Sequence, residues 1–449
     1  MYNRFLFYSS HQLFDKRFYP LYKRVRDSQW FTHKRLRLYQ ESQLRKMISF
    51  AYSYVPYYHQ LFDRLNIKIG DIQSMDDLPK IPVLTKTIIK DNWESLKPKN
   101  INNIKYYSNY TGGTTGTPLK YRLDHYNRLL GLVLLYRGWG YAGYKLGDKT
   151  VFLGGDSIDI NQKSIFSKKL HEIGRNVRKL SSFDMSSEEM KGYTKTINSF
   201  KPKFIRGYAS AIYFYCNWIK NNRISVFKPQ VVITTSDKLY DYMRLEIEDT
   251  LQCKVFDTYG LNDGGLGAYE CFQHKGLHID TERSFLEVVD NNDIQLKNGK
   301  GKVLATSLYN YSLPFIRYET GDLAESYEGK CDCGRGSKIL KQVTGRTVDV
   351  FITPENKYVH GWYFLYLFWK YGKNIKEYQI NQISKNDILI KLVLEPSFDH
   401  TVLNTIENHI RLKSQKWKVE FKYMDKIKRT ETGKFKFISN DYLTFKNEN

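Results

Sequence analysis

The sequence is poor in the features that mark several classes of protein. It holds only five cysteines in 449 residues, too few for the disulfide framework of a small secreted protein. Its apolar runs, such as Leu129–Tyr136, are far shorter than the roughly 20 residues that cross a bilayer. Residues Met1–Ser10 lack the apolar core of a signal peptide. We therefore expect a cytoplasmic protein.

The sequence also lacks a recognisable nucleic-acid-binding module, although it is strongly basic. Lysine and arginine number 70 against 47 aspartate and glutamate, which gives a net charge of +23. Nucleic acid, an anionic membrane face or anionic substrates would each attract such a charge. Without a module, we do not expect nucleic acid as a partner.

Basic and aromatic residues are interleaved in an N-terminal arm, residues 1–37. We expect this arm to be helical and to pack on its own domain, with its charges in solvent. The alternative is peripheral contact with the inner face of a membrane.

No dinucleotide-binding fingerprint, Walker lysine or Ser-His-Asp arrangement is present. A glycine-rich segment at residues 111–118 stands out instead. Its glycines are interleaved with threonines, as Thr111, Gly112, Gly113, Thr114, Thr115 and Gly116. Glycine permits positive φ, so successive N–H groups can line one concavity around an anion. The segment is either a phosphate-binding nest or a glycine-rich surface turn.

Strands and helices alternate through the middle of the chain. Apolar runs predict strands at residues 151–155, 204–208 and 231–235, and helices around 38–62, 124–138, 186–198, 209–221 and 239–250. This alternation indicates a mostly parallel sheet, whose ligands lie at the carboxyl ends of the strands.

The pattern changes after about residue 281. Short strands are predicted at 285–289 and 302–306, followed by strands near 376–384, 388–394 and 418–424 and a helix near 400–412. We therefore expect an α/β fold in two domains. Residues 1–345 form a large N-terminal domain of several subdomains with mostly parallel sheets, and residues 346–449 form a small α+β domain.

Four later segments complete a recognisable set with the glycine-rich segment: Val255–Asp263, Pro314–Asp322, Gly345–Asp349 and Lys428–Lys434. In this order they resemble the adenylate-forming superfamily, above all its phenylacetate–CoA ligase and CapK-type capsule-biosynthesis branch. Two earlier segments, Ala51–Tyr58 and Leu78–Lys86, extend the resemblance, which covers about residues 38–440. It implies the adenylate-forming enzyme fold, with the small C-terminal domain as a mobile lid.

The resemblance also implies how ATP is held. Residues Thr111 to Gly116 would bind the β- and γ-phosphates, and Tyr259, beside Gly260, would stack on adenine. Asp322 would bind the ribose hydroxyls with help from Arg346. Thr117 stands where many relatives carry a lysine, as the CapK-type branch tolerates.

The catalytic residues implied by the resemblance surround the α-phosphate. Lys434 would bridge the carboxylate and the α-phosphate, and Asn262 would contact that phosphate. Asp263 stands where the family usually has glutamate, and would help to hold Mg²⁺. Attack by a carboxylate on a phosphate brings two anions together, so the site must supply positive charge. Val348 stands at the usual hinge position of the lid, which puts the hinge assignment in question.

The acid itself is expected in a pocket near the ends of the predicted strands. This pocket would include Gly207, Tyr208, Ala209, Ser210 and Asp257.

Three of the five cysteines have metal-ligand spacing. Cys271 and His274 form a Cys-x-x-His pair, and Cys331 and Cys333 form a Cys-x-Cys pair. Four such ligands suffice for a closed tetrahedral zinc site. His278 is the competing histidine, and reduced cysteines at a surface turn are the alternative to a metal site.

The expected reaction is activation of a small carboxylic acid by ATP and Mg²⁺, forming an acyl-adenylate with release of pyrophosphate. The acyl group would then pass to an amine or hydroxyl of a sugar or polysaccharide precursor in capsule biosynthesis. The first alternative is transfer to CoA, as in an aryl-CoA ligase. The second is a non-catalytic, membrane-associated binding module.

Overall fold

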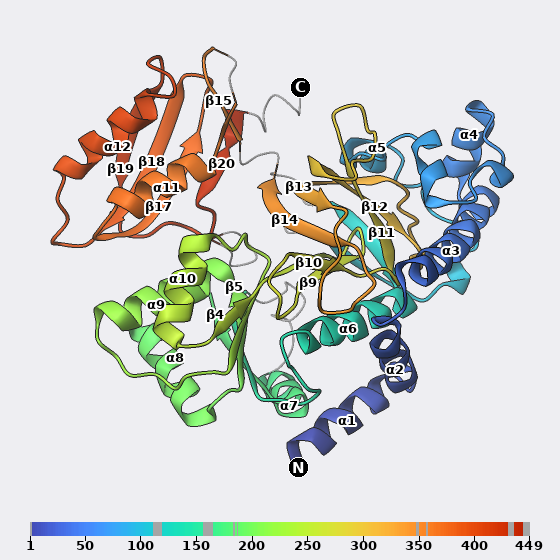
Figure 1. Cartoon of the computed structure of the whole chain (residues 1–449), viewed down its shortest axis with the longest axis horizontal. Helices are drawn as coiled ribbons and strands as arrows, with labels where there is room; N and C mark the ends of the chain where they lie inside the picture. The colour runs from blue at the N-terminus through green and yellow to red at the C-terminus, as the bar shows by residue number, and fades with distance from the viewer. Residues whose placement is uncertain are drawn as a thin grey trace. The chain divides into compact units, whose positions relative to one another are not determined.

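The computed structural model describes residues 2–110, 119–155, 165–182, 185, 187–346, 350–355, 358–429 and 435–442. The chain divides after Thr344 into two compact units, each described here by itself (Figure 1). The first unit holds a five-stranded and a seven-stranded sheet, and the second holds a four-stranded sheet. The expected α/β fold with a smaller C-terminal sheet domain is confirmed.

The first unit begins with four helices: α1 (Tyr2–Phe14), α2 (Phe18–Ser28), α3 (His33–Tyr54) and α4 (Pro56–Arg64). The single helix expected over residues 38–62 is therefore interrupted. A residue that precedes proline avoids the helical conformation, and Val55 is extended with φ −107° and ψ 107°. Pro56 then begins α4, where a missing N–H costs nothing.

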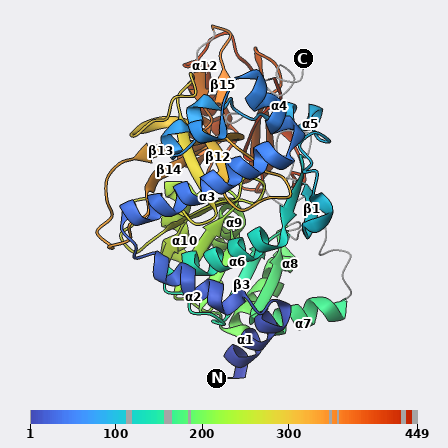
Figure 2. The same cartoon turned by 90° about the vertical axis from the view of Figure 1, so that its right-hand side faces the viewer.

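The N-terminal arm packs on its own unit, as expected. Phe7 of α1 and Phe18, Leu21 and Val25 of α2 share a buried cluster with the apolar face of α6 (His125–Gly140). Figure 2 shows α2 lying beside α6. None of the helices in the described ranges combines the length and apolar character that a membrane span requires.

A region of short helices, turns and strands links the N-terminal helices to the sheets. It contains the 3-10 turns η1 (Ile69–Asp71), η2 (Met75–Lys80) and η3 (Ile101–Asn103), helix α5 (Lys86–Asp91) and the antiparallel strands β1 (Tyr106–Tyr110) and β2 (Lys120–Asp124). The β1–β2 pair flanks residues 111–118, which lie outside the described residues.

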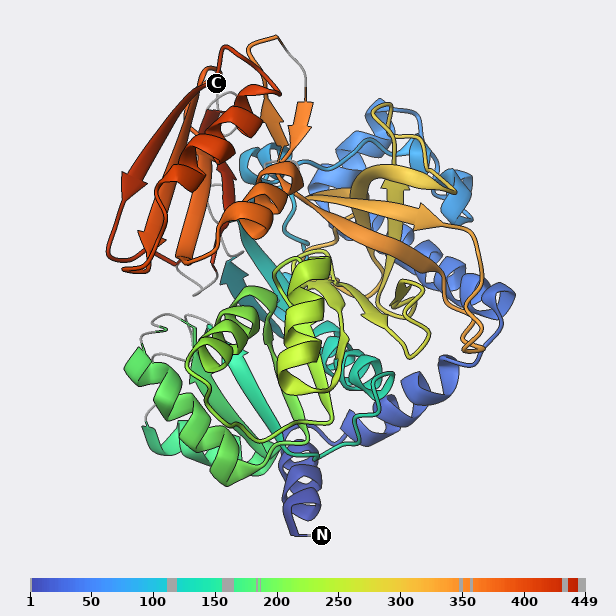
Figure 3. The same ribbon diagram turned by 60° about the vertical axis from the view of Figure 1, so that its left-hand side comes forward.

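The five-stranded sheet is wholly parallel, in the order β4-β3-β5-β6-β7. Its strands are β3 (Thr150–Gly154), β4 (Val177–Ser181), β5 (Phe204–Tyr208), β6 (Val231–Thr235) and β7 (Lys254–Phe256). Besides α6, the helices that connect these strands along the chain are α7 (Ile165–Arg175), α8 (Ser187–Phe200), α9 (Ala209–Asn221) and α10 (Asp241–Leu251). Helices α8, α9 and α10 lie together on the side of this sheet away from α6 (Figures 1 and 3).

The seven-stranded sheet has the order β11-β12-β13-β14-β10-β9-β8. Its strands are β8 (Thr258–Leu261), β9 (Leu266–Glu270), β10 (Leu277–Ile279), β11 (Ser284–Val289), β12 (Gly299–Ser307), β13 (Tyr318–Tyr327) and β14 (Ile339–Arg346). The described strand pairs are antiparallel, so parallel pairing in this unit is concentrated in the other sheet. A large apolar core joins this sheet to α3 and α4.

The second unit contains the antiparallel pair β15 (Val350–Ile352) and β16 (Tyr358–His360) and a sheet ordered β19-β18-β17-β20. The strands of that sheet are β17 (Ile375–Gln382), β18 (Asp387–Leu394), β19 (Lys418–Tyr423) and β20 (Ile438–Asn440), and its helices are α11 (Trp362–Tyr371) and α12 (Thr401–Arg411). Trp417, Phe351 and Phe364 are buried in its core.

Candidate functional site

Two carboxylates from the predicted motifs lie on the seven-stranded sheet, each held by a tyrosine. The hydroxyl of Tyr259 on β8 donates to Oδ2 of Asp322 on β13 at 2.9 Å. The hydroxyl of Tyr318 on β13 donates to Oδ2 of Asp263, just after β8, at 2.8 Å. The structure therefore brings together Tyr259, Asp263 and Asp322, which come from different motifs.

A bulge in β13 presents Asp322. Lys302 of β12 pairs with Leu323 and Leu304 pairs with Glu319, so one residue of β12 faces three residues of β13. Gly321 has φ +81° at the centre of this bulge, a conformation that favours glycine. Thr320 Oγ1 accepts a hydrogen bond from the Asp322 N–H at 3.1 Å, which fixes the turn.

Lys86 approaches the same bulge from a distant part of the chain. The backbone around Leu84 adds to β13 through Leu84 N to Arg317 O and Glu319 N to Leu84 O, each at 3.0 Å. A Cβ placed on Gly321 would lie 3.8 Å from Lys86 Nζ. The Lys86 ammonium is thus a positive charge beside the carboxylates of Asp263 and Asp322.

The pKa of Asp263 reflects this setting. Burial raises it and Asp322 raises it further, whereas the Tyr318 hydrogen bond and Lys86 lower it; the net direction is upward. A metal cation or a phosphate-bound cation would oppose that rise, because positive charge stabilises the carboxylate. A carboxylate oxygen is also a preferred Mg²⁺ ligand, so Asp263 fits the implied metal.

Sequence reasoning missed the roles of Lys86 and Tyr318 in this arrangement. Both residues lay in segments that carried the family resemblance, and this was the only available indication. Their proximity to Asp263 depends on the register of Leu84 beside β13, which no local pattern specifies.

Some of the predicted site residues lie outside the described residues, namely Thr111, Gly112, Gly113, Thr114, Thr115, Gly116 and Lys434. Arg346 ends β14. Asn262 is exposed after β8, close in sequence to Asp263. Their implied roles stay predictions.

The predicted acid-pocket residues lie at the carboxyl ends of β5 and β7. Gly207 must be glycine, because a Cβ there would lie 2.0 Å from the Leu153 carbonyl oxygen of the neighbouring strand. Ser210 donates a hydrogen bond to Asp237. Asp257 accepts from Thr234 Oγ1 at 2.7 Å and from the Thr258 N–H at 2.9 Å.

Asp257 is further linked to a buried acid. Its N–H donates to Glu270 Oε2 at 2.7 Å. Burial raises the pKa of Asp257 to about 7, with a further rise from Glu270 and an opposing effect from the Thr234 hydrogen bond. This aspartate is therefore held firmly in place at the junction of the two sheets.

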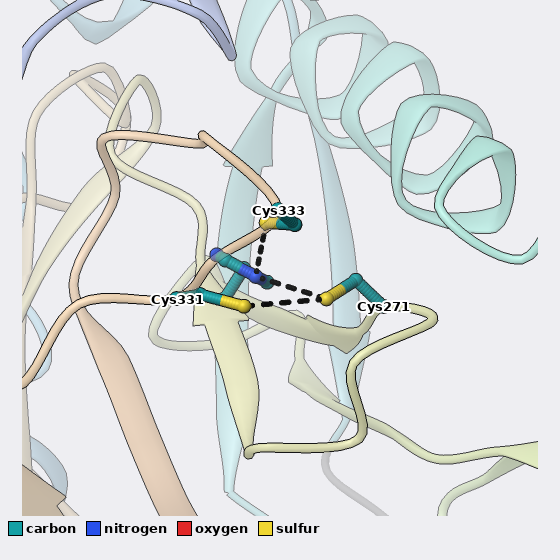
Figure 4. A group of neighbouring side chains, drawn as sticks. Cys271, Cys331 and Cys333 are labelled. Atoms are coloured by element: carbon teal, nitrogen blue, oxygen red, sulfur yellow. Dashed lines mark hydrogen bonds between the residues drawn. The ribbon is translucent and has the colours of Figure 1, made fainter.

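A second site in the seven-stranded sheet brings together three cysteines and a histidine from β10 and the connections next to it (Figure 4). Cys271 follows β9, His278 is in β10, and Cys331 and Cys333 lie in the β13–β14 connection. The ligand atoms of these four residues all lie within 4.8 Å of one another. His278 Nε2 is 3.3 Å from the sulfurs of both Cys271 and Cys333.

The geometry of this cluster fits zinc. The Cys271 and Cys331 sulfurs are 3.7 Å apart, close to the about 3.8 Å that a tetrahedral ion with 2.3 Å bonds to sulfur requires. His278 Nδ1 lies 3.2 Å from Ser337 Oγ, a partner that would orient the ring and leave Nε2 for a metal. Burial, with Arg335 and Arg137, lowers the pKa of His278 to about 4, so the ring is neutral.

His274 is corrected as a candidate ligand. Its Nδ1 lies 3.0 Å from Glu270 Oε1, and its ring packs on Phe256 with centroids 4.8 Å apart. His278, the alternative, takes its place because β10 pairs with both β9 and β14. That pairing brings His278 between the two cysteine-bearing connections.

Comparison with known proteins supports the resemblance. Residues 351–441 match the family model described as the CapK C-terminal domain. The chain is 23% identical over 440 residues to Protein CapK of Staphylococcus aureus, covering 96% of this chain and 94% of that protein. It is 24% identical over 344 residues to a phenylacetate-coenzyme A ligase of Thermus thermophilus, covering 71% of this chain and 72% of that enzyme.

The fold has a solved counterpart. A 2-hydroxyisobutyryl-CoA ligase, crystallised in its postadenylation state with an acyl-adenylate, matches with a TM-score of 0.70 and 16% identity. The match covers 91% of this chain and 90% of that one. At this identity the likeness concerns the fold.

Proposed function

We propose a reaction for this chain on the premise that it is an adenylating ligase of the adenylate-forming superfamily, in the branch of CapK and the phenylacetate–CoA ligases. It activates a small carboxylic acid with ATP, releases pyrophosphate and passes the acyl group to an amine or hydroxyl of a sugar or polysaccharide precursor. The observation that carries the activation step is the placement of Tyr259, Asp322 and Asp263 on one sheet with Lys86 beside them.

In this proposal the described residues orient the nucleotide. Asp322 accepts hydrogen bonds from the ribose hydroxyls. Tyr259 packs against adenine, while its hydroxyl donates a hydrogen bond to the Asp322 carboxylate. Asp263, oriented by Tyr318, would hold Mg²⁺, which neutralises phosphate charge when bound. Lys86 adds positive charge beside Asp263, and Lys434 is proposed to bridge the two reacting anions.

The extent of the relatives favours a sugar-type acceptor over CoA. Protein CapK aligns along 96% of the chain, whereas the phenylacetate–CoA ligase aligns along 71%. The CapK C-terminal model covers residues 351–441, which form most of the second unit. The sugar-type acceptor follows from the capsule-type branch of the resemblance, while a CoA ligase also matches 91% of this chain in fold. CoA remains the alternative acceptor.

We further propose that Cys271, His278, Cys331 and Cys333 hold a structural zinc ion. Three thiolates and one imidazole leave no open position for a substrate. The ion would fasten the β9–β10 and β13–β14 connections together. Metal analysis tests this directly: His278→Ala should lose bound zinc, whereas His274→Ala should keep about one ion per chain. Equal zinc content in both variants would contradict the ligand set.

The activation step is tested by ATP–pyrophosphate exchange across a library of carboxylic acids. Asp322→Asn keeps the size of the side chain and should weaken exchange mainly through a higher KM for ATP, because a charge-assisted hydrogen bond becomes a neutral one. Lys434→Ala should abolish exchange while ATP still binds. Full exchange by Lys434→Ala would refute its role, and no exchange or ATP binding by the wild type would favour a non-catalytic module.

The acceptor is tested by single turnover. Enzyme loaded with a radiolabelled acid and ATP is offered CoA, amino sugars or nucleotide-linked sugars, and the acyl product is identified. Transfer to CoA alone would replace the proposed acceptor with the alternative, without affecting the activation step.

A further inference from the structure

A half-buried arginine in the parallel sheet has aromatic neighbours and, among the described residues, no acidic partner. Arg206 is the middle residue of β5 and pairs with Phe152 of β3. Its guanidinium carbon lies 4.3 Å from the centroid of the Trp139 ring and 4.6 Å from that of Phe152. Within the described ranges no carboxylate pairs with it, and its buried Nε has no hydrogen-bond partner.

A second arginine adds like charge nearby. Arg175, the last residue of α7, repels the Arg206 charge and opposes the rise in the pKa of Tyr136, which burial causes. Burial lowers the pKa of Arg206 to about 10; Tyr136, Tyr144 and Tyr269 oppose this, and Arg175 adds to it. Two arginines that repel each other, with no acid between them among the described residues, are costly for the protein alone. An anion between them would remove that cost and satisfy their donors.

The arginine is adjacent to the expected acid pocket. It directly precedes Gly207–Ser210 in the chain. The Phe152 ring, on which it stacks, extends over Gly154 at the end of β3, where a Cβ would lie 2.6 Å from Phe152 Cζ. Tyr208 packs edge-on against the same ring, with centroids 6.3 Å apart. Phe152 therefore connects Arg206 to the strand ends, where ligands of parallel sheets bind.

We propose that Arg206 determines the specificity of the acid pocket by binding a second anionic group of the substrate, remote from the carboxylate that is activated. The substrate is then a dicarboxylic acid, or a carboxylic acid that also bears a sulfonate or phosphate group. The aromatic rings that flank the guanidinium would exclude water and strengthen its hydrogen bonds to that group. This inference rests on the proposed function for the identity of the reaction, and on the described geometry for the anion site.

The test compares diacids with their half-esters, which are neutral at the remote end. Binding of adipate, isophthalate and their monomethyl esters is measured by calorimetry, and 3-sulfobenzoate distinguishes a sulfonate from a carboxylate. The wild type should bind each diacid about tenfold to a hundredfold more tightly than its half-ester, as expected for hydrogen bonds between charged groups. Arg206→Met should remove this preference, and Arg206→Lys should retain part of it.

A matched control comes from another arginine of the same sheet. Arg178 of β4 also lies over an aromatic ring, with its guanidinium carbon 4.7 Å from the Phe200 centroid, but it lies at the edge of the sheet. Arg178→Met should keep the wild-type preference. A melting temperature for Arg206→Met several degrees below that of the wild type would indicate a structural role and overturn the proposal.

Exchange kinetics with the same acids separate this inference from the proposed function. Exchange that shows no preference for diacids over half-esters would overturn the role of Arg206 and leave adenylation intact. Diacid binding that depends on Arg206, without exchange for any acid, would retain the anion site and refute the reaction. A wild type that binds no anionic probe more tightly than its ester overturns the inference outright.

Discussion

Arg137 of α6 and Arg206 of β5 differ in how their charge is balanced. Arg137 lies between two carboxylates: its Nη2 is 2.5 Å from Asp280 Oδ1, and its Nη1 contacts Glu282 Oε1 and the Val25 carbonyl oxygen. Arg206 lies over two aromatic rings, and the charged group that acts on it among the described residues is another arginine, Arg175. Arg137 is buried and Arg206 half-buried, and among the described residues only Arg137 is neutralised by carboxylates of the fold.

The difference separates a structural charge from one available to a ligand. The Arg137 cluster also holds α2, because Ser28 Oγ donates to Glu282 Oε1 at 2.5 Å. Removing Arg137 would leave two buried carboxylates without their cation. Removing an arginine that lacks a counter-ion leaves no carboxylate unpaired. We therefore expect substitution of Arg137 to lower stability, and substitution of Arg206 to change ligand preference with little effect on stability.

Arg137→Met gives the largest expected effect. Asp280 and Glu282 would remain buried without their cation, so unfolding free energy should fall by about 3–5 kcal/mol. Chemical denaturation measures the change. The triple variant Arg137→Met, Asp280→Asn, Glu282→Gln should recover part of the loss, because neutral side chains cost less to bury. A loss below about 1 kcal/mol for the single variant would contradict a structural role.

His11 provides the next test, because it shares the surroundings of Arg175. Its ring lies between Phe7 and Phe18, with Nε2 3.2 Å from the Tyr136 hydroxyl. Burial, and then Arg175, lower its pKa to about 4. The unfolded chain then binds the proton more readily than the folded one, so stability falls as the pH drops from 6.5 towards 4.

The expected loss across that window is about 3 kcal/mol at its full extent. Denaturation of the wild type and His11→Gln at several pH values measures it. The variant should show a shallower decline below pH 6.5. Parallel pH profiles for the two proteins would mean that His11 gains an acidic partner when protonated, and would weaken the distinction between the two arginine environments.

Arg206→Met gives the smallest expected effect on stability. The loss of its cation–π contacts and the relief of an unpaired buried charge oppose each other, so unfolding free energy should change by less than about 1 kcal/mol. Denaturation without added acid measures this. A loss as large as that of Arg137→Met would show that Arg206 is already neutralised, and the contrast between the two would disappear.

Local patterns predicted much of the fold. The strands at 204–208 and 231–235 occur at the predicted residues, and α9 spans exactly the expected 209–221. Apolar runs and helical periodicity are properties of neighbouring residues, so they can be recognised locally. Helix α11 was not anticipated, because residues 362–371 are apolar and aromatic almost throughout and lack an amphipathic period.

The candidate site was predictable only as a set of residue types. The motifs identified Tyr259, Asp263 and Asp322. Their hydrogen bonds to one another and to Tyr318, however, depend on the inclusion of β8 and β13 in one sheet. The choice of His278 over His274 has the same origin. Spacing along the chain favoured His274, whereas strand pairing placed His278 among the sulfurs.

The amino-acid sequence by itself determined the order of elements, the resemblance to a superfamily and the residue types that carry this resemblance, because these depend on neighbouring residues and short motifs. Only the tertiary structure decided which charges are neutralised and which are not. Arg137 and Arg206 are both single arginines in apolar surroundings when read along the chain. Their environments differ because strands and helices distant in sequence bring acids to one and aromatic rings to the other.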